Sequence, residues 1–166
     1  MKLKNKTSRL SLLAALVLML TAVFAGCAGS SDSLIENEVN PQIDVYGVKI
    51  YMDEQKVHES VGSQGERAMC VYGYEYEYAD KDINIGFNAE TKQVRRVGTK
   101  NPETSIYGIK PGADLETAYK ALETNGFAKD EDSKYVFRKE NVIFTITSMK
   151  GTNADGLTIE LDPNQK

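Results

Sequence analysis

The feature of this sequence that most restricts its fold is a short pattern that occurs twice. Residues 45–49 read V-Y-G-V-K and residues 106–110 read I-Y-G-I-K, an offset of 61 positions. Asp53 and Asp114 follow the two patterns at the same offset. Because an internal repeat determines the architecture of a chain, we expect two copies of one small unit, at residues 42–103 and 104–162.

Each expected unit begins with one short helix. Asp53 and Asp114 stand where an N-cap would accept the free N–H groups of the first helical turn. In the second unit, four apolar residues then recur at the spacing of one helical face: Leu115, Ala118, Tyr119 and Leu122. The first unit has the weaker pattern, with only Val57 and Val61 on one face.

After each helix, apolar residues alternate with polar ones, which is typical of strands with one buried face. The segments with this alternation are 72–78, 83–87, 94–97, 135–137, 142–147 and 157–161. The sequence therefore predicts two tandem αβββ repeats. We expect an α+β fold in which an antiparallel sheet carries the helices on one face. The pattern leaves open whether the repeats form one continuous sheet or two.

The entry to the second helix resembles that of a known class of modules. Residues 108–114 read G-I-K-P-G-A-D, close to the pattern G-[IV]-x-x-G-M-[ST], with Ala113 and Asp114 in place of Met and Ser or Thr. The first copy, with Tyr51 before Met52 and Asp53, lacks the second glycine. This part of the chain resembles the tandem αβββ modules of SmpA/OmlA-type outer-membrane assembly lipoproteins and of β-lactamase-inhibitor-like proteins. The resemblance implies a non-enzymatic exported module that binds proteins.

The N-terminal segment has the pattern of an export signal. Residues 1–9 are basic and contain no acidic residue, and residues 10–25 are uncharged. That run is short for a bilayer-spanning helix, which needs about 20 residues. Residues 24–27 read F-A-G-C and resemble the lipobox of bacterial lipoproteins. The resemblance implies cleavage between Gly26 and Cys27 and acylation of Cys27; the alternative is an ordinary secretory signal that contains a cysteine.

We expect residues 1–26 to be a lipoprotein signal peptide and residues 27–41 to be the acylated cysteine followed by a flexible tether. The segment 28–41 is small, polar and acidic, as linkers often are. The bilayer is then a partner of the protein through Cys27, because two or more acyl chains hold a protein stably at a membrane.

The charge balance restricts the other partners. The chain has 20 basic and 24 acidic residues, and residues 1–26 contain four of the basic residues and no acidic one. The mature chain would therefore carry an excess of eight acidic groups. Nucleic acid is a poor partner for such a domain, because binding to phosphates relies on basic side chains.

Acylation of Cys27 would leave Cys70 without a disulfide partner in the chain, which has two cysteines. Cys70 is then either a buried structural thiol, which we favour, or a reactive or intermolecular thiol. In either case, no disulfide within the chain would stabilise the fold.

The sequence contains few groups suited to catalysis. His58 is the only histidine, and no serine or cysteine is placed in sequence to suggest a relay with it. Residues 80–84 read D-K-D-I-N, like the start of an EF-hand loop, but Ile85 replaces the required glycine and Thr91 the required glutamate. We expect a turn and a strand there, and we predict no enzymatic activity, no metal site and no cofactor.

The remaining surface candidate is a stripe of tyrosines. Four tyrosines alternate with other residues along one predicted strand: Tyr72, Tyr74, Tyr76 and Tyr78. Either this face packs beneath the helix, with hydroxyl groups that reach the edge, or it is an exposed aromatic ladder that binds a protein or a glycan. Glu75 and Glu77 between them favour the first interpretation, because they mark the opposite face as solvated.

These patterns together lead to one functional expectation. We expect a lipid-anchored, exported, non-catalytic protein-binding or scaffold module of the bacterial cell envelope, with an envelope protein as partner. It would lie on the outer face of the plasma membrane, or at an outer membrane if the cell has one. The alternative is a small-ligand receptor lipoprotein associated with a transporter, for which a deep polar pocket would be the distinguishing feature.

Overall fold

The computed structural model describes residues 30–164 of the chain. The predicted signal segment, the cleavage position at Gly26 and the predicted lipid attachment at Cys27 lie outside the described residues. Among the residues that are described, no helix is both long enough and apolar enough to cross a lipid bilayer.

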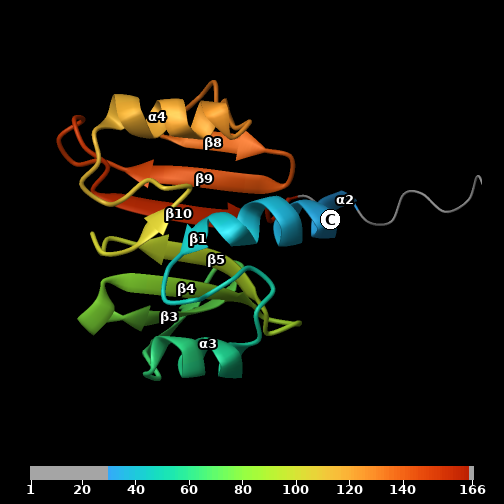
Figure 1. Cartoon of the computed structure of the whole chain (residues 1–166). Helices are drawn as coiled ribbons and strands as arrows, with labels where there is room; N and C mark the ends of the chain where they lie inside the picture. Colours follow the sequence, from blue (N-terminus) through green and yellow to red (C-terminus); the bar gives the residue numbers. More distant parts are fainter. Residues whose placement is uncertain (1–29, 165–166) are drawn as a thin grey trace, which may run out of the picture.

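The described residues form an α+β fold around one eight-stranded antiparallel sheet (Figure 1). The strand order is β2-β3-β4-β5-β10-β9-β8-β7. In that order, the strands are Glu66–Cys70, Gly73–Tyr78, Ile83–Asn88, Val94–Thr99, Gly156–Leu161, Val142–Thr147, Val136–Lys139 and Ala128–Lys129. Strands β5 and β10 pair in the middle, with Val97 opposite Ile159, so both halves of the chain share one continuous sheet. The predicted α+β class with an antiparallel sheet is confirmed.

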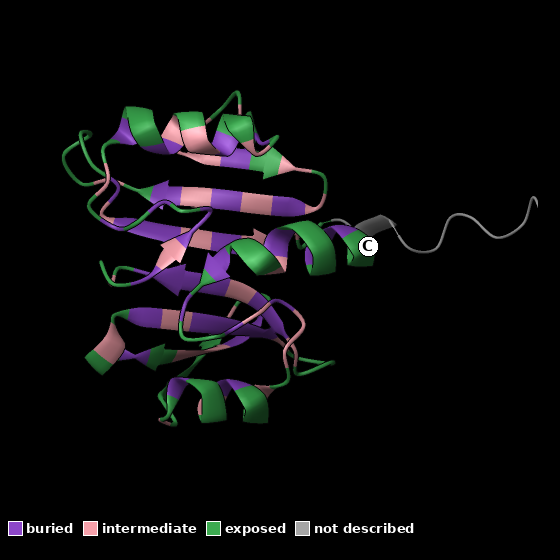
Figure 2. Cartoon of the chain, viewed as in Figure 1, coloured by how far each residue is buried: buried purple, intermediate pink, exposed green. Residues whose placement is uncertain are grey.

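The helices contact one face of this sheet. The described chain has three α-helices: α2 (Ser30–Leu34), α3 (Glu54–Val61) and α4 (Leu115–Thr124). Helix α3 lies along the first half of the sheet and α4 along the second, with α2 between them (Figure 1). Val57 and Val61 of α3 are buried, as are Ala118 and Leu122 of α4, whereas the outer surfaces of both helices are exposed (Figure 2). Apolar periodicity predicted both helices, and their positions agree.

From Ser30 onward, the segment predicted to be a flexible tether is instead part of the folded domain. Residues 30–42 form α2, a π-helical turn at Ile35–Val39 and a 3-10 turn at Asn40–Gln42. Leu34, Ile35 and Val39 are at most 5% exposed and belong to the hydrophobic core. The wider turn of the π-helix brings these three apolar residues to one side, so a segment of polar composition still supplies a buried face.

The two halves of the chain make matching local contacts. Tyr46 and Tyr107, at the start of the repeated pattern, both adopt the left-handed backbone conformation that non-glycine residues rarely take. Two backbone hydrogen bonds in the first half, Val48 N to Val45 O and Val94 N to Met52 O, are matched by Ile109 N to Ile106 O and Ala154 N to Ala113 O. Strands β1 (Ile43–Asp44) and β6 (Ser105–Ile106) also pair with each other.

Each half has four strands in the main sheet where three were predicted. The additional strands are the edge strands β2 and β7. Strand β2 reads E-R-A-M-C and its first four residues are all exposed, and both residues of β7 are exposed. Without alternating burial neither segment has the periodicity of a strand, so only its hydrogen bonds to β3 or β8 reveal it.

Candidate functional site

The face of the sheet opposite the helices is polar and is left uncovered by the described helices. Strand register aligns one row of side chains across five strands: Glu77, Asn84, Gly98, Thr158 and Thr145. A neighbouring row contains Glu75, Gly86, Arg96, Glu160 and Ile143. We call this surface the open face. Its residues alternate along each strand with the buried residues of the core, because successive side chains of a strand point to opposite faces.

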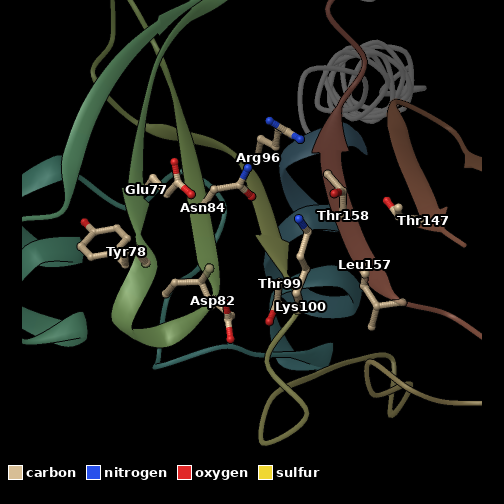
Figure 3. Close-up of a pocket in the computed structure, with 13 residues that line it drawn as sticks. Glu77, Tyr78, Asp82, Asn84, Arg96, Thr99, Lys100, Thr147, Leu157 and Thr158 are labelled. Atoms are coloured by element: carbon tan, nitrogen blue, oxygen red, sulfur yellow. The ribbon is translucent and has the colours of Figure 1, made fainter. Parts of the chain in front are cut away.

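A groove of about 320 Å³ lies on the open face over β3, β4, β5 and β10. Glycine in β5 leaves room there for a side chain from the neighbouring strand. A Cβ atom at Gly98 would lie 1.9 Å from Oδ1 of Asn84, so the Asn84 side chain occupies the space that a larger residue would fill. Asn84 and Lys100 extend into the groove from β4 and the end of β5, and Thr158 lines it from β10 (Figure 3).

The groove combines unpaired polar groups with charges that are already paired. The side chains of Glu77, Asn84 and Lys100 make no hydrogen bond or ion pair with another described residue. In contrast, Nη1 of Arg96 lies 2.9 Å from the Glu75 carboxylate. Asp82, a second acid in the lining, also has no side-chain partner among the described residues, so two acids, one base and one amide are available to a ligand. These groups are suited to hydrogen bonding with a polar surface or a peptide backbone.

A β-bulge adds a second arginine to the open face. The register between β4 and β5 shifts between Gly86 and Phe87. Arg95 is 9% exposed, and its Nη1 lies 3.4 Å from the carboxylate of Glu160. Because a bulge places two consecutive residues opposite one, Arg95 and Arg96 both make ion pairs on this face. The charge of the open face is thus held in fixed positions.

The predicted tyrosine stripe is shorter than expected and lies on the helix-covered face. Tyr74 and Tyr78 are 4% and 1% exposed, and Tyr76 is half-buried. Tyr72 precedes β3 in the turn after β2 and is 51% exposed. The alternation breaks at Gly73, whose backbone has φ +144°, and the Tyr72 ring lies instead 5.4 Å from the guanidinium carbon of Arg95. Buried rings cannot contact a partner, so Tyr74 and Tyr78 are core residues.

Polar side chains of helix α3 form a cluster with the hydroxyl groups of these tyrosines. The Tyr74 and Tyr76 hydroxyls donate hydrogen bonds to the two carboxylate oxygens of Glu54, the latter at 2.7 Å. The Tyr78 hydroxyl lies 2.9 Å from Nδ1 of His58. The only histidine of the chain is therefore held among tyrosines, in contacts that sequence spacing did not indicate.

The pKa values in this cluster follow from burial and hydrogen bonding. Burial raises the pKa of Tyr78 to about 12, with smaller contributions from Tyr76 and Glu54. Burial also raises the pKa of Tyr74 strongly, and its hydrogen bond to Glu54 adds to the effect. For Glu54, burial acts to raise the pKa, but the two tyrosine hydrogen bonds and nearby positive charge outweigh it and lower the pKa. The cluster keeps the phenols neutral and the carboxylate charged.

Cys70 is half-buried at the end of β2, and it is a free thiol. Its Sγ lies 3.8 Å from Nη2 of Arg95. Cys70 therefore lies beside the paired charges of the open face and outside the apolar core, and it is half-buried where the sequence favoured a buried structural thiol.

Sequence reasoning missed the open face as a candidate site. The signal that would have indicated it was glycine within strands: Gly86 and Gly98 interrupt β4 and β5, and glycine inside a strand often marks a bulge or a place where another group approaches closely. Among the described residues, no group of three or more histidine, cysteine, aspartate or glutamate side chains is arranged to hold a metal ion.

Comparisons with known proteins identify a likeness of fold. No protein-family model matches the chain, and no curated protein matches it. A solved structure of an extracellular protein containing an SCP domain, from Bacillus anthracis str. Ames, aligns with a TM-score of 0.53 at 12% sequence identity. The match covers 69% of this chain and 44% of that chain, so the chain corresponds to less than half of the solved protein. At this identity, the likeness extends to the fold alone.

Proposed function

We propose that this protein is a lipid-anchored, non-catalytic module of the bacterial cell envelope that binds a protein partner on its open face. The observation that carries the binding role is the uncovered polar face, with a groove where Glu77, Asn84 and Lys100 have no partner among the described residues. Unpaired polar groups and fixed charges on a rigid sheet favour specific recognition, because their positions are set before binding.

The anchor in this proposal rests on the N-terminal pattern, with Cys27 as the acylated residue. The solved protein of similar fold is described as extracellular, which supports an exported location. We further propose that residues 42–103 and 104–162 are tandem copies of one unit. The matched backbone hydrogen bonds of the two halves support this, as does the mirrored order of strands on either side of the β5–β10 pair.

The groove also supports a second candidate function, the small-ligand receptor. Its volume of about 320 Å³ is at the lower end of the range of roughly 300–1,000 Å³ for small-molecule sites. A ligand there would be small and polar, and it would meet Glu77 and Lys100 on the surface of the sheet instead of in a deep cleft. The shallow site favours the protein-binding function over the receptor.

The lipid anchor is tested by metabolic labelling of the full-length chain with a clickable fatty acid in a bacterial host. The wild-type chain should carry label and sediment with membranes, and Cys27→Ser should lose both properties. Cys70→Ser is the matched control, because it removes the other cysteine of the chain and should keep the label. Equal labelling of Cys27→Ser and wild type would exclude this anchor.

The binding face is tested by photo-crosslinking in the same cells. A crosslinking residue at Glu77 reports on the groove, and one at Glu116 reports on the exposed side of α4. We expect one discrete protein adduct from Glu77, which Lys100→Glu abolishes and the control Lys120→Glu on α4 does not. Adducts that are identical from Glu77 and Glu116, or absent from Glu77, would contradict binding on the open face.

A further inference from the structure

The tip of the β2–β3 hairpin, residues 69–72, is an exposed apolar surface. Met69 is 75% exposed, Val71 is 90% exposed and Tyr72 is 51% exposed. Among the described residues only two other large hydrophobic side chains are exposed, Tyr46 and Met149. Three of five such side chains therefore lie within four consecutive residues, and an apolar cluster of this kind usually marks a contact with a partner or a membrane.

The hairpin tip lies at one edge of the sheet. Cys70 pairs with Gly73, which leaves Val71 and Tyr72 as the turn, and β2 is the edge strand. No charged side chain occurs between Ala68 and Tyr74. The tip thus has the composition of a surface that enters the interfacial region of a bilayer: apolar side chains at the end, with a tyrosine that has both an apolar ring and a polar hydroxyl.

A chain of contacts places this tip at the same end of the sheet as the start of the described chain. Gly73, next to the tip, pairs with Asn88 at the end of β4. The following turn leads to Val94, whose backbone bonds to Tyr51 and Met52. The Tyr51 side chain in turn lies near Asp32 in α2, and after burial, which is the main cause, this carboxylate also raises the pKa of Tyr51.

The start of α2, at the same end of the sheet as the tip, is close in sequence to Cys27. Helix α2 begins at Ser30, three residues after Cys27, and three residues span at most about 10 Å. An acyl group on Cys27 would therefore hold this end of the domain against the bilayer, without the long tether that the composition suggested.

We propose that the tip formed by Met69, Val71 and Tyr72 inserts into the headgroup region of the bilayer as a second membrane contact beside the lipid on Cys27. This inference rests on the proposed lipid anchor. The partner is a zwitterionic or neutral lipid surface, because the excess of acidic groups in the chain disfavours anionic headgroups. Two contacts at one end fix the orientation of the domain, with the strands directed away from the membrane and the open face accessible from the side.

The absence of tryptophan from the sequence allows a direct test. The chain from Cys27 to Lys166, which contains every described residue, is prepared with Cys70→Ser and coupled through Cys27 to a maleimide lipid in phosphatidylcholine vesicles. Val71→Trp places a single fluorophore at the tip. Met149→Trp is the matched control: Met149 is 82% exposed and lies in the β9–β10 loop, at the opposite end of the sheet, where Thr147 pairs with Gly156.

The expected result is a blue shift of Val71→Trp emission and quenching of about half its intensity by brominated lipids, since a residue in the headgroup region is close to them. Met149→Trp emission should not change. Circular dichroism of both variants should match the parent chain. If Val71→Trp is not quenched, or if both variants are quenched equally, the proposal is wrong. A second reporter, Tyr72→Trp, should repeat the result if Val71→Trp fails to fold.

Because Cys27 is coupled to the lipid chemically, the result for the tip does not depend on whether cells acylate Cys27. If the full-length chain is not acylated at Cys27 in cells but Val71→Trp is quenched on vesicles, the proposed anchor fails and the affinity of the tip for lipid stands. If Cys27 is acylated and Val71→Trp is not quenched, the anchor stands and the second contact is overturned.

Discussion

The hydroxyl of Tyr78 lies 2.9 Å from Nδ1 of His58, so the single histidine of the chain is held by a residue that is only 1% exposed. The two residues are 20 positions apart in sequence. Their contact joins α3 to β3 on the helix-covered face, next to the hydrogen bonds that Glu54 accepts from Tyr74 and Tyr76. The cluster therefore has a structural role: it fastens the first helix to the sheet.

The Tyr78 hydroxyl should contribute measurably to stability. Tyr78→Phe removes the hydrogen bond to His58 and should lower the free energy of unfolding by about 1 kcal/mol. Tyr107→Phe is the matched control, because the buried hydroxyl of Tyr107 has no hydrogen-bond partner among the described residues; its removal should leave stability unchanged or slightly higher. Urea denaturation of both variants measures the difference, and equal losses would mean that the His58 contact contributes nothing.

The same cluster predicts a loss of stability at alkaline pH. Tyr78 titrates near pH 10 when unfolded, and burial raises its pKa to about 12 in the fold. Below pH 10 the phenol is neutral in both states, so its contribution is fully present. Between pH 10 and about 12 the unfolded state loses its proton first, and the free energy of unfolding falls. Urea midpoints across this range should fall more steeply for the wild type than for Tyr78→Phe. Parallel curves would contradict the raised pKa.

The helical segment at residues 30–42 should be an essential part of the core. Ile35→Ala removes a fully buried side chain and should cost about 2–5 kcal/mol. Glu36→Ala, at the adjacent exposed position, should change stability by less than about 0.5 kcal/mol. Thermal or urea unfolding of the two variants distinguishes a packed helix from a flexible tether, for which both substitutions would be equally harmless.

The two predicted N-caps should differ in strength. The Asp114 side chain accepts a hydrogen bond from the backbone N–H of Thr117, so Asp114→Ala should cost about 1 kcal/mol. The Asp53 side chain makes no capping bond and forms only an exposed ion pair with Lys56. Asp53→Ala should therefore cost no more than a few tenths of a kcal/mol. Chemical denaturation measures both, and a larger loss at Asp53 would contradict the capping geometry.

The parts of the fold that were predicted correctly are those in which neighbouring residues carry the signal. The spacing of Val57 and Val61 was enough to place α3, and the alternation from Ile83 to Phe87 was enough to place β4, because burial of one face leaves a local period in the sequence. The same reasoning extended the tyrosine stripe one step too far. Tyr72 fits the period, but a Cβ at Gly73 would lie 2.1 Å from the carbonyl oxygen of Phe87, and the chain turns there.

The sequence by itself determined the order of helices α3 and α4 and of the six inner strands of the main sheet, and which face of each long strand is buried, because these depend on the spacing of apolar residues along short segments. Only the tertiary structure decided that Gly98 lies beside Thr158, a residue 60 positions away, and that the open face has a groove lined by Asn84 and Thr158. The pairing of β5 with β10 joins distant segments whose local patterns allow several partners. The free energy of the complete core selects one of them, and no single segment contains that information.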